Sequence, residues 1–325
     1  MMKIPRTLFI AWGISLLLSV ASSVCAQSNS TPSFRFATRA EAQMLITDID
    51  DYTRNWNQFD INSRLQTTEG KKSQLLTLAM NETRNWSDKE KERINRAMKA
   101  INTQIKKQKL TLPFPNEVVL VKTTMKEEGG AGGYTRKNWI ALGENILNEA
   151  SDETLTRILS HEIFHILTRS NKKFKAAAYS TIGFHVLNRE ILFPADIIEK
   201  RISNPDISSH DSYGVFTIQG EKKNCTMLLY TPKAYNGAGS FFEYAKVGLI
   251  PLNEQFIPIQ HNGETLIYNL SDAEDFLSQV GENTNYIINP EEILADHFSF
   301  ILTGKKEIKS PDVIERLKQV LKTSY

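Results

Sequence analysis

Apolar residues recur at helical spacing along much of the first third of the chain. The clearest case follows Ser87, which forms a capping-box pair with Glu90 at the start of a helix. The apolar positions behind this cap lie three or four residues apart and predict one buried helix face: Ile94, Ala97, Met98, Ile101 and Ile105. We therefore expect a mostly helical N-terminal region over residues 34–110.

Strand-like runs follow this helical region. Val118 to Thr124 is rich in β-branched residues and predicts a first strand, and Tyr134 to Leu142 predicts a second. The glycine-rich connection between them, Glu127 to Gly133, lacks the Gly-Lys-Ser/Thr ending of a phosphate-binding loop. Val215 to Ile218 and Met227 to Tyr230 resemble further short strands. Together these runs predict a small mixed sheet.

A second long helical pattern begins after Ser151, which serves as its cap. Its apolar residues cover most of the helix circumference: Leu155, Ile158, Leu159, Ile163, Phe164, Ile166 and Leu167. A helix that is apolar nearly all round is buried in the core. Three more helices are expected, from Ser271 to near Gly281 with Glu274 in a capping box, from Asn289-Pro290 to near Gly304, and from Ser310-Pro311. The fold class predicted is α+β.

The buried helix after Ser151 contains the motif His161-Glu162-Ile163-Phe164-His165. Histidines four residues apart share one helix face and can bind one metal ion together. The carboxylate of Glu162 beside them is placed to accept a proton from a water on that ion. Two histidines and a glutamate on an apolar helix need a buried partner, which favours a metal over a chance pattern.

A catalytic zinc usually has three protein ligands, so one more must come from elsewhere in the chain. Glu292 and Asp296 lie four apart on the helix that begins at Pro290. Glu292 can bind the metal, and Asp296 can accept a hydrogen bond from the nitrogen of a histidine that does not bind it. Capping of its own helix is the competing role for Glu292, and Glu291 is the substitute ligand. His297 is expected to pack or to support the site.

The two motifs together resemble those of the gluzincin metallopeptidases. The Glu-x-x-Ala-Asp form at Glu292–Asp296 is similar to the branch with CAAX-processing and envelope quality-control proteases. The resemblance covers two short helices and implies a zincin-like fold over residues 111–325, with zinc bound by His161, His165 and Glu292. It also implies Glu162 as general base and Asp296 as the residue orienting a ligand histidine. In similar proteases, an edge strand such as Tyr134 to Leu142 pairs with the substrate.

A tyrosine or histidine usually donates a hydrogen bond to the oxyanion in such a site. The sequence leaves four candidates open: His185, His210, Tyr213 and Tyr235. Among them, His210 and Tyr213 follow a polar stretch from Asn204-Pro205-Asp206 that could line a cleft. His185 could equally be a core histidine. Geometry has to decide between the four.

Residues 1–26 have the pattern of a secretory signal peptide. Lys3 and Arg6 precede an apolar run, Leu8 to Val20, and Val24-Cys25-Ala26 predicts cleavage before Gln27. An uncleaved membrane anchor and a lipoprotein at Cys25 are the alternatives. Residues 27–33 are expected to form a linker. The expected location is periplasmic or secreted, with no stable membrane insertion after cleavage.

The net charge indicates which classes of partner to expect, and the cysteine content indicates whether disulfides can form. The chain has 39 basic and 37 acidic residues, and cleavage would remove two basic residues and no acidic ones. A neutral mature protein gives no reason to expect nucleic acid as a partner. Cys225 would then be the single cysteine, expected to be buried and unreactive.

These features predict a zinc metallopeptidase acting on a protein or peptide substrate. In the expected mechanism, Glu162 as general base takes the proton of a zinc-bound water during attack on a peptide bond. Three alternatives remain from the sequence. They are a catalytically inactive zincin-fold binding protein, a zinc amidase acting on cell-wall peptides, and a structural protein without metal.

Overall fold

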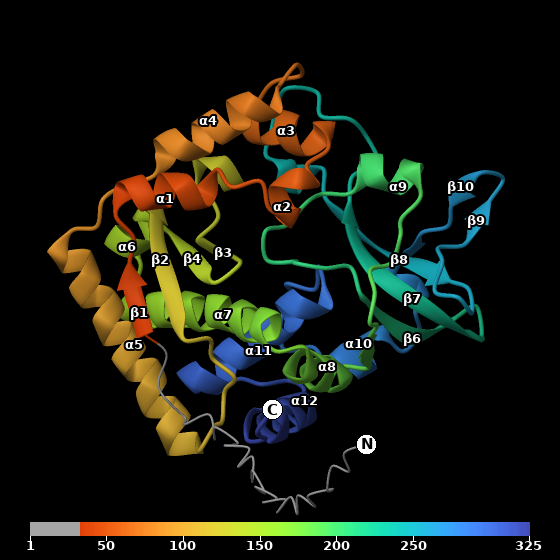
Figure 1. The fold of residues 1–325 in the computed structure, drawn as a ribbon. Coiled ribbons are helices and arrows are strands. Elements are labelled where there is room, and N and C mark those ends of the chain that lie inside the picture. Colours follow the sequence, from red (N-terminus) through yellow and green to blue (C-terminus); the bar gives the residue numbers. More distant parts are fainter. Residues whose placement is uncertain (1–32) are drawn as a thin grey trace, which may run out of the picture. The chain divides into compact units, whose positions relative to one another are not determined.

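The computed structural model describes residues 33–325, which combine helices with two larger sheets (Figure 1). This mixture agrees with the expected α+β class. The predicted signal peptide at 1–26, its cleavage site and residues 27–32 of the predicted linker lie outside the described residues. Ser33, the last residue of that linker, begins the first strand. Within residues 33–325, no helix has the length and apolar character that crossing a membrane requires.

A four-stranded mixed sheet lies beside the motif helix. Its strands are β1 (Ser33–Phe36), β2 (Glu117–Thr123), β3 (Gly133–Arg136) and β4 (Trp139–Gly143), in the order β1-β2-β4-β3. β2 pairs in parallel with both β1 and β4, whereas β3 runs antiparallel to β4. Because β1 pairs with β2, the predicted helical region 34–110 begins with a strand of this sheet.

Helices cover both faces of this sheet (Figure 1). Alternate residues of a strand point to opposite faces, and the sequence supplies apolar side chains for both. On one face, strand residues join the main core with α5 and α7: Val118, Leu120, Ile140 and Leu142. On the other face, they pack with α1 and α4: Val119, Val121, Trp139 and Ala141. The sheet is therefore the buried middle layer that supports the motif helix.

The helices before and around the sheet largely follow the expected pattern. The first five are α1 (Arg39–Ile46), α2 (Asp51–Arg54), α3 (Gln58–Leu65), α4 (Lys72–Glu82) and α5 (Asp88–Gln108). The next three are α6 (Glu144–Glu149), α7 (Asp152–Ser170) and α8 (Lys172–Ser180). α5 begins with the predicted capping box of Ser87 and Glu90, which is confirmed by both of its hydrogen bonds.

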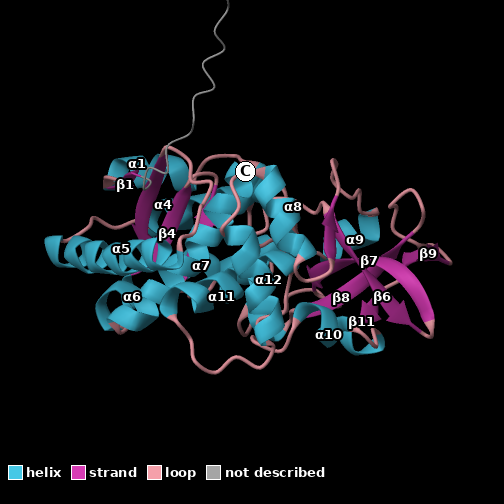
Figure 2. Ribbon diagram, turned by 90° about the horizontal axis from the view of Figure 1, so that it is seen from below, coloured by secondary structure: helices cyan, strands magenta, loops and turns pink. Residues whose placement is uncertain are grey.

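A five-stranded antiparallel sheet forms the other side of the protein (Figure 2). Its strands, in the order β11-β8-β7-β6-β5, are β5 (Phe184–Val186), β6 (Ser212–Ile218), β7 (Glu221–Tyr230), β8 (Lys246–Leu252) and β11 (Tyr268–Asn269). The two short strands predicted here are confirmed as parts of β6 and β7. The expected burial of Cys225 is also confirmed, since it lies in β7 and joins the main core. β9 (Gln260–His261) and β10 (Glu264–Thr265) form a separate small hairpin.

The remaining helices are α9 (Ala195–Lys200), α10 (Phe276–Val280), α11 (Pro290–Thr303) and α12 (Pro311–Leu321). Three short 3₁₀ turns complete the described elements: η1 (Lys126–Glu128), η2 (Phe241–Glu243) and η3 (Leu270–Asp272). α11 packs along α7, and α12 packs on α11 and α8. α7 thus lies between the mixed sheet and α11, buried on both sides.

The single strand expected over Tyr134 to Leu142 is wrong, because the run forms the β3–β4 hairpin. The chain reverses at Lys137 and Asn138, and Lys137 takes a left-handed φ of 47°. Lysine rarely marks such a turn, so the apolar residues on either side read as one continuous strand. The reversal places β3 at the end of the sheet within the described residues.

The helix expected to begin at Ser271 is also wrong in its start and length. That segment forms η3 and then α10, which begins only at Phe276. The side chain of Asp275 accepts hydrogen bonds from the backbone N–H and the hydroxyl of Thr217. Ala273 also forms a bridge to Ile218 of β6. These tertiary contacts hold residues 273–275 against the sheet in place of a first helical turn.

Acidic residues at the start of the glycine-rich connection are buried between the sheet and α3. Glu128 accepts hydrogen bonds from Arg64 Nε at 3.0 Å and from the hydroxyl of Tyr52. Glu127 is 2% exposed, and the hydroxyl of Tyr134 donates to its Oε1 at 3.3 Å. Among the described residues, none hydrogen-bonds its Oε2. Burial raises the pKa of the Glu127 carboxyl to about 7.

We expect the wild-type protein to lose stability relative to Glu127→Gln as the pH rises from about 4.5 to about 8. The ordinary pKa of this carboxyl is 4.5, and the folded state raises it to about 7. Below pH 4.5 the Glu127 carboxyl is protonated in both the unfolded and the folded protein. Above pH 7 the folded protein must bury the charged carboxylate. The shift corresponds to about 3 kcal/mol of unfolding free energy. Urea unfolding of both proteins at the two pH values measures it.

The exposed Glu69 supplies the control for this prediction. Glu69→Gln removes the same charge from the surface, and its stability relative to wild type should not change by this amount with pH. An identical pH dependence for wild type and Glu127→Gln would contradict the prediction.

Candidate metal centre

The motif histidines face α11 from the middle of α7. Ser151 caps α7 by accepting the N–H of Thr154, as predicted, and the helix continues unbroken to Ser170. His161 and His165 are one turn apart, and their ring centroids lie 4.9 Å from each other. His165 is fully buried, whereas the side chain of His161 keeps 12% exposure. The helix therefore presents both imidazoles on one face, as its spacing predicts.

α11 brings three carboxylates to the same place. The side chain of Asn289 caps this helix by accepting the N–H of Glu291, and Pro290 occupies its first turn. The capping role that competed for Glu292 is therefore wrong. Asn289 and the N–H of Glu291 form the cap, and the Glu292 side chain points to the histidines. Glu291, Glu292 and Asp296 are all buried.

Each motif histidine has its Nδ1 against a carboxylate of α11. His161 Nδ1 lies 3.1 Å from Asp296 Oδ1, and His165 Nδ1 lies 3.0 Å from Glu291 Oε1. Thr168 and Tyr179 also donate hydrogen bonds to Glu291 and fix its position. A carboxylate at Nδ1 keeps the proton on that nitrogen and leaves Nε2 free as a ligand. Glu291 therefore orients His165 just as Asp296 orients His161.

Both Nε2 atoms point toward the carboxylate of Glu292. Glu292 Oε2 lies 3.0 Å from His161 Nε2 and 3.7 Å from His165 Nε2. His165 Nε2 is buried, and no described residue forms a hydrogen bond with it. The ligand atoms of His161, His165 and Glu292 all lie within 4.8 Å of one another. Two imidazoles and a carboxylate around an unpartnered nitrogen are a donor set that fits Zn²⁺.

Glu162 lies beside this group and is held by the β3 strand. The hydroxyl of Thr135 donates to Glu162 Oε2 at 2.7 Å, and Glu162 is 3% exposed. Burial raises the pKa of Glu162 to about 8, and the negative charge of Asp206 contributes. A cation bound nearby would lower the pKa of Glu162. The carboxylate is therefore oriented and can hold or release a proton near neutral pH.

The charged groups around the histidines shift one another's pKa values. Burial lowers the pKa of His161, but hydrogen bonds with Asp296 and Glu292 outweigh it and hold that pKa well above its usual value. Burial would raise the pKa of Glu291, Glu292 and Asp296, yet their histidine partners keep all three below the usual range. The three carboxylates of α11 are thus stabilised in the ionised form, which Glu292 needs in order to bind a metal.

Two residues of a polar loop complete the site. Asn204 Nδ2 donates to Glu292 Oε1 at 2.6 Å. Asp206 Oδ1 accepts the backbone N–H of Thr135 at 2.6 Å and lies 4.0 Å from His165 Nε2. Burial raises the pKa of Asp206 well above its usual range. The sequence marked this stretch as a polar loop able to line a cleft, without indicating which of its side chains reach the histidines.

The four predicted oxyanion donors make their contacts away from the motif residues His161, Glu162 and His165. The His185 ring stacks on Tyr213 between β5 and β6, with centroids 5.1 Å apart, and Tyr235 packs in a separate core with Phe59 and Tyr244. His210 packs its ring on Phe193. His297 is buried on α11, and its ring centroid lies 6.3 Å from that of Phe300.

Tyr286 is a second tyrosine, after Tyr179, that the structure brings to the site. Its ring lies 6.2 Å from that of His161, and part of its side chain stays exposed. Its N–H donates to Thr284, whose hydroxyl donates to Asp296. Sequence reasoning missed it, although it precedes α11 by a few residues and therefore had to lie near the helix carrying Glu292.

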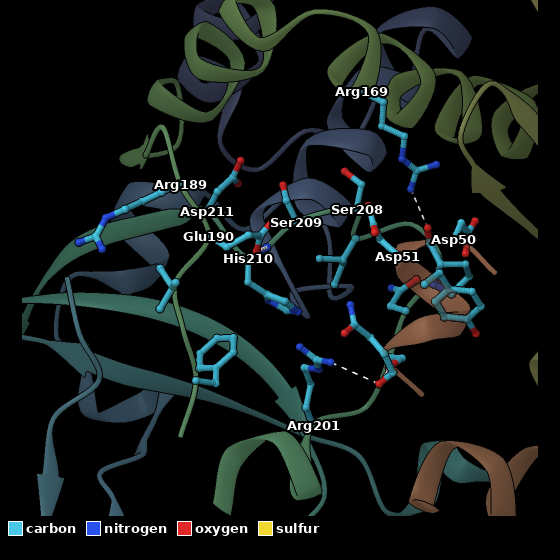
Figure 3. A pocket seen from close by; sticks show the side chains of 18 of the residues that line it. Asp50, Asp51, Arg169, Arg189, Glu190, Arg201, Ser208, Ser209, His210 and Asp211 are labelled. Carbon is cyan, nitrogen blue, oxygen red and sulfur yellow. Dashed lines mark hydrogen bonds between the residues drawn. The ribbon is translucent and has the colours of Figure 1, made fainter. Parts of the chain in front are cut away.

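A hollow of about 840 Å³ borders the polar loop, and neither motif histidine is among its lining residues (Figure 3). Basic side chains from several elements line it, together with acidic ones: Arg136, Lys137, Arg169, Lys172, Arg189, Arg201, Asp50, Asp51, Glu190 and Asp211. Arg169, from the last turn of α7, points into this region and donates to the carbonyl of Pro205 at 2.6 Å. The loop is thus a wall between the hollow and the candidate metal centre.

Comparison with known proteins identifies no relative, because no family model, curated protein or solved structure matches this chain. The similarity to gluzincins therefore continues to depend on the two motifs alone.

Proposed function

We propose that the protein is an exported, zinc-dependent metallopeptidase with a zincin-like arrangement of gluzincin type. One observation carries the proposal. Two histidines of α7 have their Nδ1 atoms held by Asp296 and Glu291, so that both Nε2 atoms converge on Glu292. His165 Nε2 is buried and has no hydrogen-bond partner among the described residues, which leaves this nitrogen available to bind a metal ion.

His161, His165 and Glu292 would hold the zinc. When bound, Zn²⁺ lowers the pKa of a water and polarises the carbonyl of the scissile bond. Glu291 and Asp296 keep the two imidazoles in the tautomer that presents Nε2. Asn204 holds the second oxygen of Glu292 and so fixes the direction of the first. These six side chains form a connected network that orients three ligand atoms before any metal arrives.

Glu162 is the proton-transfer group of this proposal. Thr135 orients its carboxylate toward the site, where it can take a proton from the attacking water and pass it to the leaving amine. The side chain of Tyr286 lies near His161 and can donate a hydrogen bond to the developing oxyanion. It replaces the four tyrosine and histidine candidates taken from the sequence.

The β3 strand is the proposed platform for the substrate. It ends the mixed sheet within the described residues, and Gly143 N–H bonds to the carbonyl of Gly132. Because antiparallel pairs alternate, Tyr134 N–H then faces β4, whereas Thr135 N–H faces the free edge. An extended peptide can add to such an edge as a further strand. Its carbonyl would then pass between Glu162 and the histidines.

Metal analysis combined with a hydrolysis assay tests the proposal. We expect the purified protein to bind about one Zn²⁺ per chain. A chelator should remove the metal and the hydrolysis of a casein-like substrate, and added Zn²⁺ should restore both. A zinc amidase would instead cleave cell-wall peptides and leave casein intact, and a binding protein would cleave neither. Failure to bind any transition metal after zinc is supplied would contradict the proposal.

A further inference from the structure

The polar loop between α9 and β6 lies where a substrate would have to bind. Its tip is a turn, Asn204–Ile207, closed by a hydrogen bond from the N–H of Ile207 to the carbonyl of Asn204 at 3.1 Å. Within this turn, the Asp206 N–H donates to Asn204 Oδ1 at 2.9 Å. The turn therefore projects two side chains, Asn204 and Asp206, toward the candidate metal centre.

Asp206 accepts the backbone hydrogen bond that a substrate strand paired with β3 would accept. The Thr135 N–H faces the free edge of β3, and Asp206 Oδ1 accepts it at 2.6 Å. The oxygen of a substrate backbone would accept the same N–H if a peptide paired with β3. One donor in this geometry serves one strong acceptor, so the turn and a paired substrate exclude each other.

Asp206 also fills the space between the base and the metal-binding nitrogen. Its carboxylate, that of Glu162 and a ring nitrogen of His165 lie within 4.8 Å of one another. A scissile carbonyl has to lie between these same groups for Glu162 to assist attack on it. The carboxylate thus occupies the position of the reacting group as well as the position of the paired backbone.

The turn is attached in a way that permits it to leave. Among the described residues, none between 203 and 211 belongs to an apolar core cluster. Polar contacts hold the segment, among them Arg169 on the Pro205 carbonyl and Arg64 on the Ser203 carbonyl at 2.7 Å. Eight of the nine residues from 203 to 211 border the 840 Å³ hollow, and Asp206 is the one absent from that lining. Movement into the hollow would therefore not require the core to open.

We propose that the Asn204–Ile207 turn is a built-in inhibitory plug, in which Asp206 occupies the substrate position on β3 until the tip of the turn swings into the hollow while Asn204 stays on Glu292. The inference rests on the proposed peptidase function, which supplies the substrate that the turn excludes. It assigns Asp206 a role in keeping the enzyme closed, and it assigns the hollow the role of receiving the displaced turn.

Hydrolysis of an unstructured peptide by zinc-loaded full-length variants tests the plug. Asp206→Ala removes the carboxylate and should raise kcat/KM by about tenfold or more, since open states are commonly populated at only ~0.1–10%. Arg169→Ala removes the hydrogen bond that holds the Pro205 carbonyl and should also raise kcat/KM. Ser208→Ala, on the exposed part of the loop, should leave it unchanged.

Amide hydrogen exchange gives a readout that needs neither metal nor activity. In Asp206→Ala, the Thr135 amide should exchange at least about tenfold faster than in wild type, since it loses its acceptor. The Tyr134 amide, which faces β4, should keep its rate and thereby show that the hairpin remains folded. An unchanged Thr135 rate would overturn the proposal.

The activity results separate this inference from the proposed function. If the wild-type enzyme cleaves the peptide and folded Asp206→Ala and Arg169→Ala cleave it no faster, the plug is wrong and the peptidase assignment stands. If wild type and both released variants bind zinc yet cleave nothing, both proposals fail. A gain in both released variants, with none in Ser208→Ala, supports the plug.

Discussion

Replacing Glu162 with Gln is expected to abolish nearly all hydrolysis while the protein keeps its zinc. The substitution retains the size of the side chain and its hydrogen bond with Thr135, and Glu162 is not among the three converging ligands. It removes the group that accepts the proton, which typically contributes about 10²–10⁴ in rate. We therefore expect kcat/KM to fall by about a thousandfold at unchanged metal content.

Glu127 provides a matched control for this variant. It is also a buried glutamate in contact with β3, through the hydroxyl of Tyr134, but it lies on the opposite face of the mixed sheet. Glu127→Gln should retain both zinc and hydrolysis. Full activity in Glu162→Gln would rule out Glu162 as the base. Loss of zinc in that variant would instead indicate that Glu162 helps to bind the metal.

Neighbouring glutamates of α11 are expected to differ sharply in their effect on metal binding. Glu292→Gln removes a charged ligand oxygen that both Nε2 atoms face, and we expect the purified variant to hold almost no zinc. Glu291→Gln leaves the three ligands in place and weakens the orientation of His165 alone. Loss of such a supporting hydrogen bond typically costs 10- to 100-fold in metal affinity. Competition with a chromogenic chelator measures both affinities.

This pair of variants also decides which glutamate is the ligand, a point that the sequence left open. The expected order of affinity is wild type, then Glu291→Gln, then Glu292→Gln. The reverse order for the two variants would assign the metal to Glu291 and contradict the ligand set proposed here. Circular dichroism of each variant checks that α11 remains folded, since both residues lie in its first turn.

Local patterns in the sequence predicted the parts of the site that lie on helices. The spacing of His161 and His165, and that of Glu292 and Asp296, fixes each pair on one helix face whatever the rest of the chain does. The caps at Ser87 and Ser151 were also predictable, because a cap depends on residues three positions apart. These predictions needed no knowledge of the tertiary structure.

The missed features all depend on contacts between distant segments. Thr135 reaches Glu162 from β3, and Asp206 and Tyr286 reach the histidines from the loop before β6 and from the segment before α11. No spacing rule connects these positions, so a sequence can suggest a polar loop but not its target. The role of Glu291 was hidden for a related reason. Only the positions of His165, Thr168 and Tyr179 show what its carboxylate does.

The register of the β3–β4 hairpin sets the position of two parts of the candidate site at once. Thr135 offers its hydroxyl to Glu162 and its backbone N–H to the free edge, so one residue aligns both the base and whatever pairs with β3. A slip of one residue in the hairpin would turn that hydroxyl to the opposite face of the sheet. The Lys137-Asn138 reversal fixes the register of the hairpin and therefore also the position of Thr135 relative to Glu162. Insertions there should misalign base and substrate together, even though the turn touches neither.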